Sequence, residues 1–327
     1  MTASRPSGMS LRRPRSPSGA PSSRREGRAE AAPEGSAETP GRRTRLSEVE
    51  TAQRMVDVGV ARLEAEGLTV GLGALRMERV IADAGVSRAT AYRRWPRRED
   101  FLADVLTATV RRTTLLPETG ADVARLLDVI ETHGDRLAEA QGRRDLVVEA
   151  LRVASDADIR RVMASPQWRT YLALGATHHT LADPALRAAV GDALAETGQR
   201  FRERRAEVFA GMAGLIGYRL REPWAALPDG GGFLAMSSAA GVAMMGIVST
   251  ALPRPAWLDE RRPLALFGAS LSSPWSEAER VLVAVFLDHL EPDPDIDWSA
   301  ARVAQALLDF RASAQSLLAG QAPQVPA

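Results

Sequence analysis

Residues 85–100, GVSRATAYRRWPRRED, constrain the fold more than any other stretch of this sequence. Gly85 permits a left-handed turn, and Ser87 is placed to cap the N-terminus of a short helix that runs to Trp95. Before the turn, apolar residues at helical spacing predict another short helix from about Arg76 to Ala84. Two short helices joined by a tight glycine-containing turn form a helix-turn-helix.

The second of these helices has two distinct faces. At 100° per residue, Ala91 and Trp95 share the side of Val86 and form an inward seam. The remaining positions form an outward surface of hydrogen-bond donors, one methyl group and an aromatic hydroxyl: Arg88, Ala89, Thr90, Tyr92 and Arg93.

That outward surface suits the major groove of DNA. Arginine donates two hydrogen bonds to the O6 and N7 edge of guanine, and the Ala89 methyl can pack on the methyl of thymine. The hydroxyls of Ser87, Thr90 and Tyr92 can donate to phosphate oxygens, and Arg98 lies where it can reach the backbone. The alternative is a solvated basic surface helix with a packed tryptophan.

The spacing of this segment resembles the DNA-binding segment of the tetracycline-repressor (TetR) family of bacterial regulators. The matching residues are Ala84-Gly85-Val86-Ser87, Thr90-Ala91-Tyr92, Trp95 and Arg98, within a resemblance that covers roughly residues 47–106. Departures are Ala91 where the family usually has Leu, Arg98 where it often has Lys, and Arg76-Met77 where a capping Ser or Thr is usual.

The resemblance assigns roles to individual positions. It implies base contacts from Arg88, Ala89 and Arg93 and backbone contacts from Ser87, Thr90, Tyr92 and Arg98. It implies a structural role in the turn and core for Gly85, Val86, Ala91 and Trp95.

Two further helices complete a predicted DNA-binding domain over residues 46–112. Ser47-Glu48-Val49-Glu50 has the form of a capping box, and Gly67 supplies a stop. Apolar positions at helical spacing are Val49, Ala52, Val56, Val60 and Leu63 in the first helix and Phe101, Leu102, Val105 and Leu106 in the last.

Residues 1–45 differ in composition from the rest of the chain. They hold ten arginines and four glutamates, a net charge of +6, whereas the whole chain has +1 and the remainder therefore −5. With Leu11 as their one large aliphatic residue, they are expected to be disordered, and they lack the apolar core of a secretory signal. They are either an arm that adds phosphate contacts or an inert tail.

From residue 117 to 320 the pattern predicts a larger, all-helical domain without strands. Ser165-Pro166 and Asp183-Pro184 each pair an N-cap with proline at the first helical position. Ser276-Glu277-Ala278-Glu279 has a capping-box pattern, and Ala300–Leu318 forms a last helix. The overall fold class is thus all-α.

Residues 233–252 form a stretch of twenty residues without a charge, which by length could span a membrane. Its residues are mainly Ala, Gly, Ser and Met, and no basic cluster flanks it. A buried helix whose small residues let neighbours approach closely is the favoured interpretation. A membrane-associated regulator that uses this segment is the alternative.

By family analogy, the second domain binds a small effector and forms the homodimer. Candidate pocket residues are Trp168, Tyr171, His178, Phe209 and Met212, with His179 beside them; the alternative is that they are ordinary core or surface residues. For the dimer, the helices over 233–252 and 277–290 are favoured, the latter for Val281, Leu282 and Val285.

The sequence favours a non-enzymatic, cytoplasmic regulator without a cofactor. It has no cysteine, so thiolate metal sites and cysteine nucleophiles are excluded. It contains no glycine-rich phosphate loop, metal signature or nucleophile elbow. The expected function is a dimeric repressor that binds a near-palindromic operator in double-stranded DNA and is released by a small ligand. A transcriptional activator would use the same DNA contacts.

Overall fold

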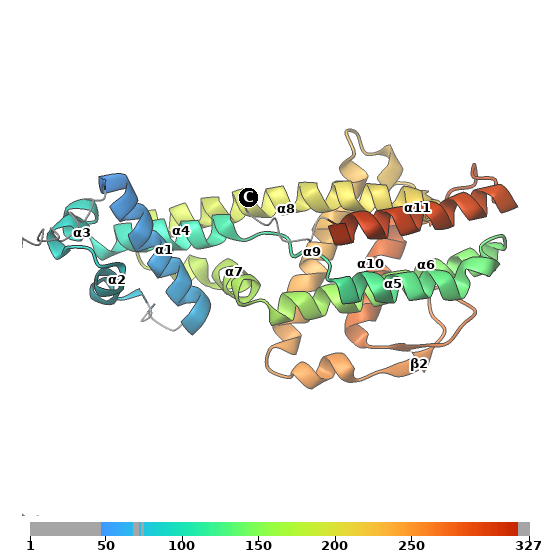
Figure 1. The fold of residues 1–327 in the computed structure, drawn as a ribbon, viewed down its shortest axis with the longest axis horizontal. Coiled ribbons are helices and arrows are strands. Elements are labelled where there is room, and N and C mark those ends of the chain that lie inside the picture. The colour runs from blue at the N-terminus through green and yellow to red at the C-terminus, as the bar shows by residue number, and fades with distance from the viewer. Residues whose placement is uncertain (1–46, 68–71, 73–74, 320–327) are drawn as a thin grey trace, which may run out of the picture. The chain divides into compact units, whose positions relative to one another are not determined.

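The helix-turn-helix predicted from the sequence lies at the start of a long series of helices (Figure 1). The computed structural model describes residues 47–67, 72 and 75–319. The segment 1–45, predicted to be disordered, lies outside these described residues. The first four helices are α1 (Glu48–Glu66), α2 (Met77–Ala84), α3 (Arg88–Arg94) and α4 (Arg98–Arg112).

Helix α1 begins where the sequence predicts. Ser47 accepts a hydrogen bond from the Glu50 amide, and the Glu50 carboxylate accepts one from the Ser47 amide, so the capping box is present. One apolar position was predicted wrongly: Val49 is 78% exposed, whereas Met55 is fully buried. Val49 lies in the first turn of α1, and the buried residues of this helix begin at Met55.

The core of the first four helices continues into two later ones. Helices α7 (Pro166–Thr177) and α8 (Pro184–Leu215) contribute Leu174, Leu186 and Val190 to the same buried cluster as Val105 of α4. Helix α4 packs along α8, and α1 contacts α7. The domain boundary between residues 112 and 117 therefore stays a prediction, since apolar packing crosses it.

The remaining helices are α5 (Gly120–His133), α6 (Ala140–Ala164), α9 (Gly231–Ala251), α10 (Glu277–His289) and α11 (Ala300–Ala319), with short 3-10 turns η2 (Gly134–Arg136), η3 (His178–Thr180), η4 (Trp224–Ala226) and η5 (Pro255–Asp259). The predicted caps are confirmed. Ser165 and Asp183 each accept a hydrogen bond from a first-turn amide ahead of a proline, and Ser276 forms the capping box of α10.

The predicted all-α fold class is confirmed, but the expectation of a second domain without any strand is wrong. Four three-residue strands occur among the described residues: β1 (Tyr218–Leu220), β2 (Arg262–Leu264), β3 (Ser273–Trp275) and β4 (Leu290–Pro292). They form two antiparallel pairs, β1 with β4 and β2 with β3. Three residues are too few to show the alternation of apolar and polar positions that marks a strand in sequence.

Helix α9 corresponds to the predicted apolar segment. Within the described part of the chain, it is the one helix long and apolar enough to cross a membrane by length and composition. One side of it is buried against α6, α8 and α10, with Met236, Ser237 and Ala240 facing inward. The other side is open, since Val242 is 75% exposed. Helix α9 is thus a partly covered helix of the bundle.

Candidate nucleic-acid interface

The turn between α2 and α3 depends on Gly85. Its φ of 63° lies in the left-handed region, where a Cβ is costly. The Gly85 amide donates to the Ala82 carbonyl and the Val86 amide to the Ile81 carbonyl, so the turn satisfies the end of α2. A Cβ placed on Gly85 would contact nothing within 4 Å. The requirement for glycine is therefore one of backbone conformation.

Ser87 fixes the start of α3. Its hydroxyl accepts a hydrogen bond from the Thr90 amide at 3.1 Å and lies 2.8 Å from the Thr90 hydroxyl. Both side chains were predicted to contact phosphate. In the structure, the two hydroxyls are within hydrogen-bond distance of each other, and that of Ser87 also caps the first turn of α3. Ser87 is exposed and Thr90 half-buried.

The inward seam anchors α3 to its own domain. Ala91 and Trp95 are each 1% exposed, and Val86 packs at the edge of the same core. Trp95 stacks edge-to-face on Phe101 with ring centroids 5.3 Å apart. The Trp95 indole donates a 2.8 Å hydrogen bond to Asp104 of α4. Sequence analysis missed Asp104. It lies nine residues after Trp95 and on another helix, so no local pattern pointed to this contact.

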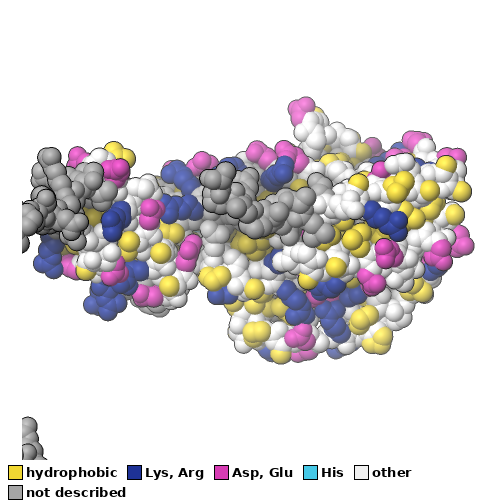
Figure 2. All heavy atoms as spheres, viewed as in Figure 1, with side chains coloured by type: hydrophobic (Ala, Val, Ile, Leu, Met, Phe, Trp, Pro, Cys, Tyr) yellow, Lys and Arg dark blue, Asp and Glu magenta, His cyan; other side chains and the backbone are white. Residues whose placement is uncertain are grey.

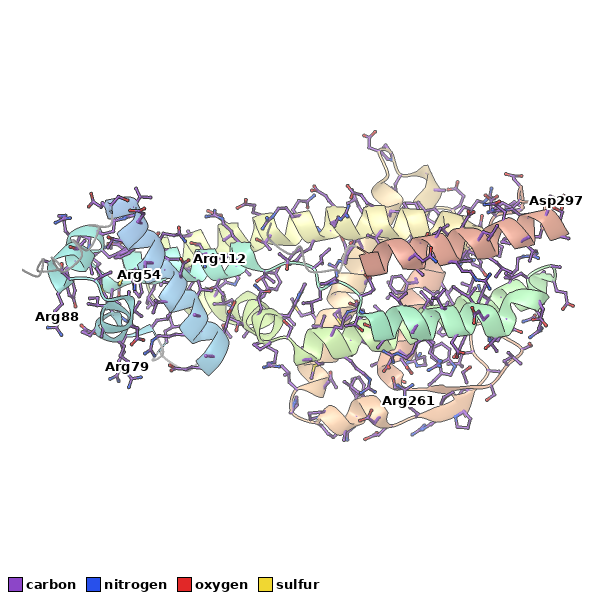
Figure 3. The ribbon with its side chains drawn as sticks, in the orientation of Figure 1. Arg54, Arg79, Arg88, Arg112, Arg261 and Asp297 are labelled. Atoms are coloured by element: carbon purple, nitrogen blue, oxygen red, sulfur yellow. The ribbon has the colours of Figure 1, made fainter. Side chains whose placement is uncertain are left out.

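Three side chains predicted to read bases lie on the exposed side of α3. Arg88, Ala89 and Arg93 are all exposed, and Arg88 projects away from the helices (Figure 3). Arg93 lies 3.6 Å from the Glu48 carboxylate. Over the visible face of α1 and α2, basic side chains are interspersed with acidic ones (Figure 2). The exposed side of α3 therefore presents two guanidinium groups as hydrogen-bond donors. That of Arg93 is close to the Glu48 carboxylate.

Tyr92 has a partner that the sequence did not predict. It is 43% exposed, and its hydroxyl donates a 2.8 Å hydrogen bond to Glu78 of α2. This hydrogen bond raises the pKa of Tyr92. The pKa of Glu78 is lowered, first by a backbone hydrogen bond at the start of α2 and then by Tyr92. Tyr92 must leave Glu78 or share its hydroxyl to contact a phosphate.

The arginines after α3 have different surroundings. Arg94 lies 3.5 Å from Asp104 and 5.5 Å from the centre of the Trp95 ring. Arg97 pairs with Asp100 and lies 3.9 Å from Asp183, the N-cap of α8. Arg98, predicted to contact the DNA backbone, begins α4 and is exposed. Arg94 and Arg97 thus join α3 and α4 to their neighbours.

The candidate pocket residues separate into four locations. Trp168 and Tyr171 meet Phe201 in an aromatic cluster, with Trp168 and Phe201 stacked at 5.1 Å. Phe209 packs edge-to-face on Phe286. Met212 is 37% exposed on α8. His178 and His179 lie in η3, where His178 Nδ1 is 3.2 Å from the Gly175 carbonyl.

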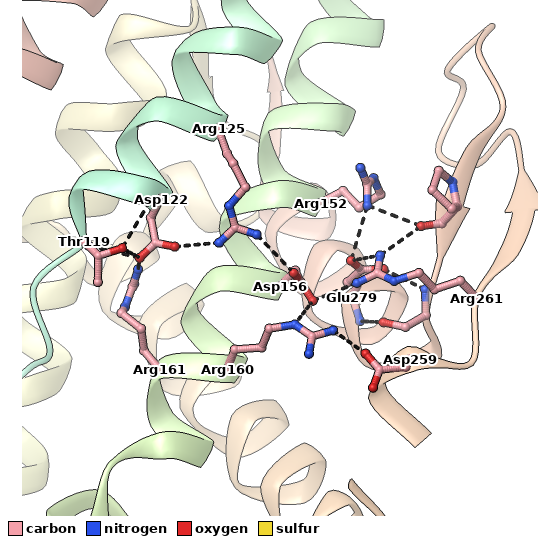
Figure 4. Close-up of polar contacts among 12 residues, drawn as sticks. Thr119, Asp122, Arg125, Arg152, Asp156, Arg160, Arg161, Asp259, Arg261 and Glu279 are labelled. Atoms are coloured by element: carbon pink, nitrogen blue, oxygen red, sulfur yellow. Dashed lines mark hydrogen bonds and ion pairs between the residues drawn. The ribbon is translucent and has the colours of Figure 1, made fainter. Parts of the chain in front are cut away.

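An ion-pair network links α5, α6, α10 and the residues before β2 (Figure 4). Glu279 of α10 is fully buried and pairs with Arg261 at 2.7 Å and Arg152 at 3.4 Å. Beside the network is an open cleft of about 680 Å³. It is lined by three arginines and three carboxylates, Arg125, Asp128, Glu149, Arg152, Asp156 and Arg261, together with Ala124, Val129, Val153 and Pro274. Its charges balance, and sequence analysis did not single out these residues.

Comparison with known proteins gives one distant likeness. No family model matches the sequence, and no curated protein is similar to it in sequence. A solved structure from Mesorhizobium loti, of a protein assigned to the TetR family of transcriptional regulators, matches with a TM-score of 0.37 and 16% identity, over 74% of this chain and 96% of that chain. So distant a likeness does not show the family or activity of this chain.

Proposed function

We propose that this chain is a sequence-specific DNA-binding transcriptional regulator. The observation that carries the proposal is the α2–turn–α3 unit, in which a buried seam fixes a short helix and leaves arginines exposed. Ala91 and Trp95 hold α3, and Arg88, Ala89 and Arg93 remain at the surface. A helix presented in this way is the recognition element of helix-turn-helix proteins.

In the proposed complex, α3 enters the major groove. Arg88 and Arg93 bond to base edges, and the Ala89 methyl packs on thymine. Ser87, Thr90, Tyr92 and Arg98 contact the sugar-phosphate backbone and set the register. On binding, Arg93 exchanges Glu48 for a base edge, and Tyr92 exchanges Glu78 for a phosphate. Both exchanges are possible because each pair is exposed to solvent.

The regulator is proposed to act as a homodimer. The open side of α9 carries Val242, 75% exposed, and Met245, 45% exposed, which supports an apolar interface there. On helix α10, the predicted interface residue Leu282 is instead buried in the chain's own core, and Val281 and Val285, both half-buried, pack against the same core. A two-fold dimer presents its recognition helices about 34–36 Å apart, so the operator is a near-palindrome. We propose that the dimer is a repressor that a small ligand releases from the operator. The alternative is a transcriptional activator, which would use the same DNA contacts.

A membrane role for α9 has less support. One side of α9 packs against α6, α8 and α10, so lipid would reach only the open side. We propose a cytoplasmic protein that is no enzyme. Fractionation tests this part of the proposal, because a chain that stays with membranes until detergent is added contradicts it.

The central test is selection of bound sites from random double-stranded DNA with the purified full chain. A near-palindromic consensus is the expected result. Arg88→Ala or Arg93→Ala then costs about 1–3 kcal/mol of binding free energy and relaxes preference at individual base pairs. Arg98→Ala weakens all sequences alike and lowers the salt slope by about 1.

The matched control for these variants is Arg204→Ala, which removes an exposed arginine from α8, where it pairs with Glu207. It is expected to leave operator affinity unchanged. Undiminished operator binding by a triple variant of Arg88, Tyr92 and Arg93 contradicts the proposed recognition surface.

A further inference from the structure

Two carboxylates from neighbouring helices engage side chains on the exposed face of α3. Glu78 of α2 accepts a hydrogen bond from the Tyr92 hydroxyl at 2.8 Å. A backbone hydrogen bond at the start of α2, the Tyr92 hydroxyl and the nearby charge of Arg88 together lower the pKa of Glu78. Glu48 of α1 lies 3.6 Å from the Nε atom of Arg93. Three groups with a proposed DNA contact therefore lie beside an acidic side chain of the same chain.

Both carboxylates lie in the first turn of a helix. Glu48 is the first residue of α1, and Glu78 is the second residue of α2. The unpaired amides of a first turn favour a negative charge, and the lowered pKa of Glu78 keeps this group ionised at neutral pH. Two negative charges therefore border the surface that is proposed to meet the phosphates of DNA.

The two carboxylates and DNA compete for the same donors. A tyrosine hydroxyl has a single proton to donate, so Tyr92 cannot donate to Glu78 and to a phosphate at once. The side chains of Arg93 and Glu48 are 65% and 63% exposed, so a nucleic acid can reach this pair as well. A carboxylate that stays beside a bound phosphate repels it, since both are negatively charged.

Another carboxylate of α1 has a partner with no proposed DNA contact. Glu66, at the C-terminal end of the helix, pairs with Arg62. It lies eighteen residues after Glu48, about 27 Å away at 1.5 Å per residue. Exposed charges are largely screened beyond about 8 Å at physiological salt. Glu66 therefore supplies a control with the same charge on the same helix.

We propose that Glu48 and Glu78 are competing carboxylates, which weaken DNA binding by holding donors of α3 and by repelling phosphates. Their removal is then expected to tighten binding, whereas removal of Arg88, Arg93 or Arg98 weakens it. Because phosphate contacts supply essentially all of non-specific binding, the competing carboxylates also limit retention on DNA that lacks an operator. The inference rests on the proposed function, whose recognition surface it takes as the place where DNA binds.

Neutral variants of the full chain test the competition. Glu48→Gln and Glu78→Gln are titrated against a random-sequence DNA duplex by fluorescence anisotropy, at about 0.15 M salt and at higher salt. Each variant is expected to bind about 3- to 10-fold more tightly than wild type. The slope of log affinity against log salt is expected to steepen by about 1, as for one added phosphate contact. Unchanged or weaker binding by both variants overturns the proposal.

Glu66→Gln separates local competition from net charge. It changes the net charge by the same amount and is expected to alter affinity by less than about 2-fold, because its position is screened from α3. Tightening by Glu66→Gln equal to that of Glu48→Gln and Glu78→Gln overturns the proposal. A purely structural role of the two carboxylates predicts the opposite sign, since loss of a stabilising contact would weaken DNA binding.

Tyr92→Phe tests the contact with Glu78 directly. This variant lacks the hydroxyl that Glu78 holds, so adding Glu78→Gln is expected to tighten binding less in Tyr92→Phe than in wild type. The comparison is a double-mutant cycle, which isolates the interaction between the two side chains. An equal gain in both backgrounds contradicts competition for the Tyr92 hydroxyl.

Random duplex is the probe because it needs no operator, so the two proposals can fail separately. Tighter binding by the variants, without any consensus from site selection, supports the competing carboxylates and contradicts a sequence-specific regulator. A selected operator whose affinity is unchanged in both variants supports the regulator and contradicts the competing carboxylates. Absence of DNA binding by wild type and by both variants contradicts both proposals.

Discussion

At the scale of single residues, Gly85 shows how one backbone angle positions a whole recognition helix. Gly85→Ala is expected to cost about 1–2 kcal/mol of unfolding free energy, because an L-residue is strained at a φ of 63°. Steric clash adds nothing, since no atom lies within 4 Å of a Cβ there. Gly85→Asn, which tolerates left-handed backbone better, is the control. Denaturant unfolding measures both, and an equal loss in the two variants contradicts this account.

The Tyr92–Glu78 pair gives a second prediction at this scale. The hydrogen bond from Tyr92 to Glu78 raises the pKa of the tyrosine. Glu78→Gln therefore lowers the pKa of Tyr92 toward its ordinary value, and ultraviolet titration against Tyr92→Phe isolates this group. Asp83→Asn, on the same helix but paired with Arg62, is expected to leave it unchanged. A Tyr92 pKa that does not move in Glu78→Gln contradicts the contact.

At the scale of elements, the start of α5 depends on a charged cap. Burial opposes ionisation of Asp122, but hydrogen bonds from Thr119, Arg161 and Arg125 outweigh it and lower the pKa of Asp122 well below its ordinary value. A lowered folded-state pKa stabilises the fold above the unfolded pKa of about 3.9, and this stabilisation is lost as the pH falls toward the folded value.

Asp122→Asn is accordingly expected to cost about 2 kcal/mol at neutral pH. The difference from wild type should shrink as the pH falls below about 4. Urea unfolding across pH measures it, with Asp128→Asn, an exposed position on the same helix, as the control. A difference that persists unchanged in acid would mean that the cap acts without its charge.

Short sequence patterns predicted most of the helices, but they did not predict contacts between residues on different helices. Capping residues and prolines marked the starts of α1, α7, α8 and α10 because those hydrogen bonds span three residues. The buried seam of α3 followed from helical period alone. Asp104 and Glu78 could not be found in this way, because each acquires its role from a residue on another helix. The three-residue strands were too short to carry a period.

At the scale of the whole molecule, α8 joins the helix-turn-helix to the rest of the bundle. Leu186, near its start, belongs to the core that contains Val105 of α4. Arg205 lies nineteen residues further along, about 28 Å at 1.5 Å per residue. One continuous helix carries both positions, and a rigid packed element of this kind can couple two distant sites.

This arrangement predicts that α4 and α8 open together. Leu186→Ala removes part of their shared core and is expected to cost about 2–5 kcal/mol, with faster amide hydrogen exchange in both α4 and the first half of α8. Leu287→Ala, in a cluster of α6, α10 and their neighbours that contains no residue of α4, is the control and should speed exchange in α10 first. If Leu186→Ala leaves exchange in α4 unchanged, the two helices are separable, and α8 cannot transmit a ligand's effect to the recognition helix by rigid packing.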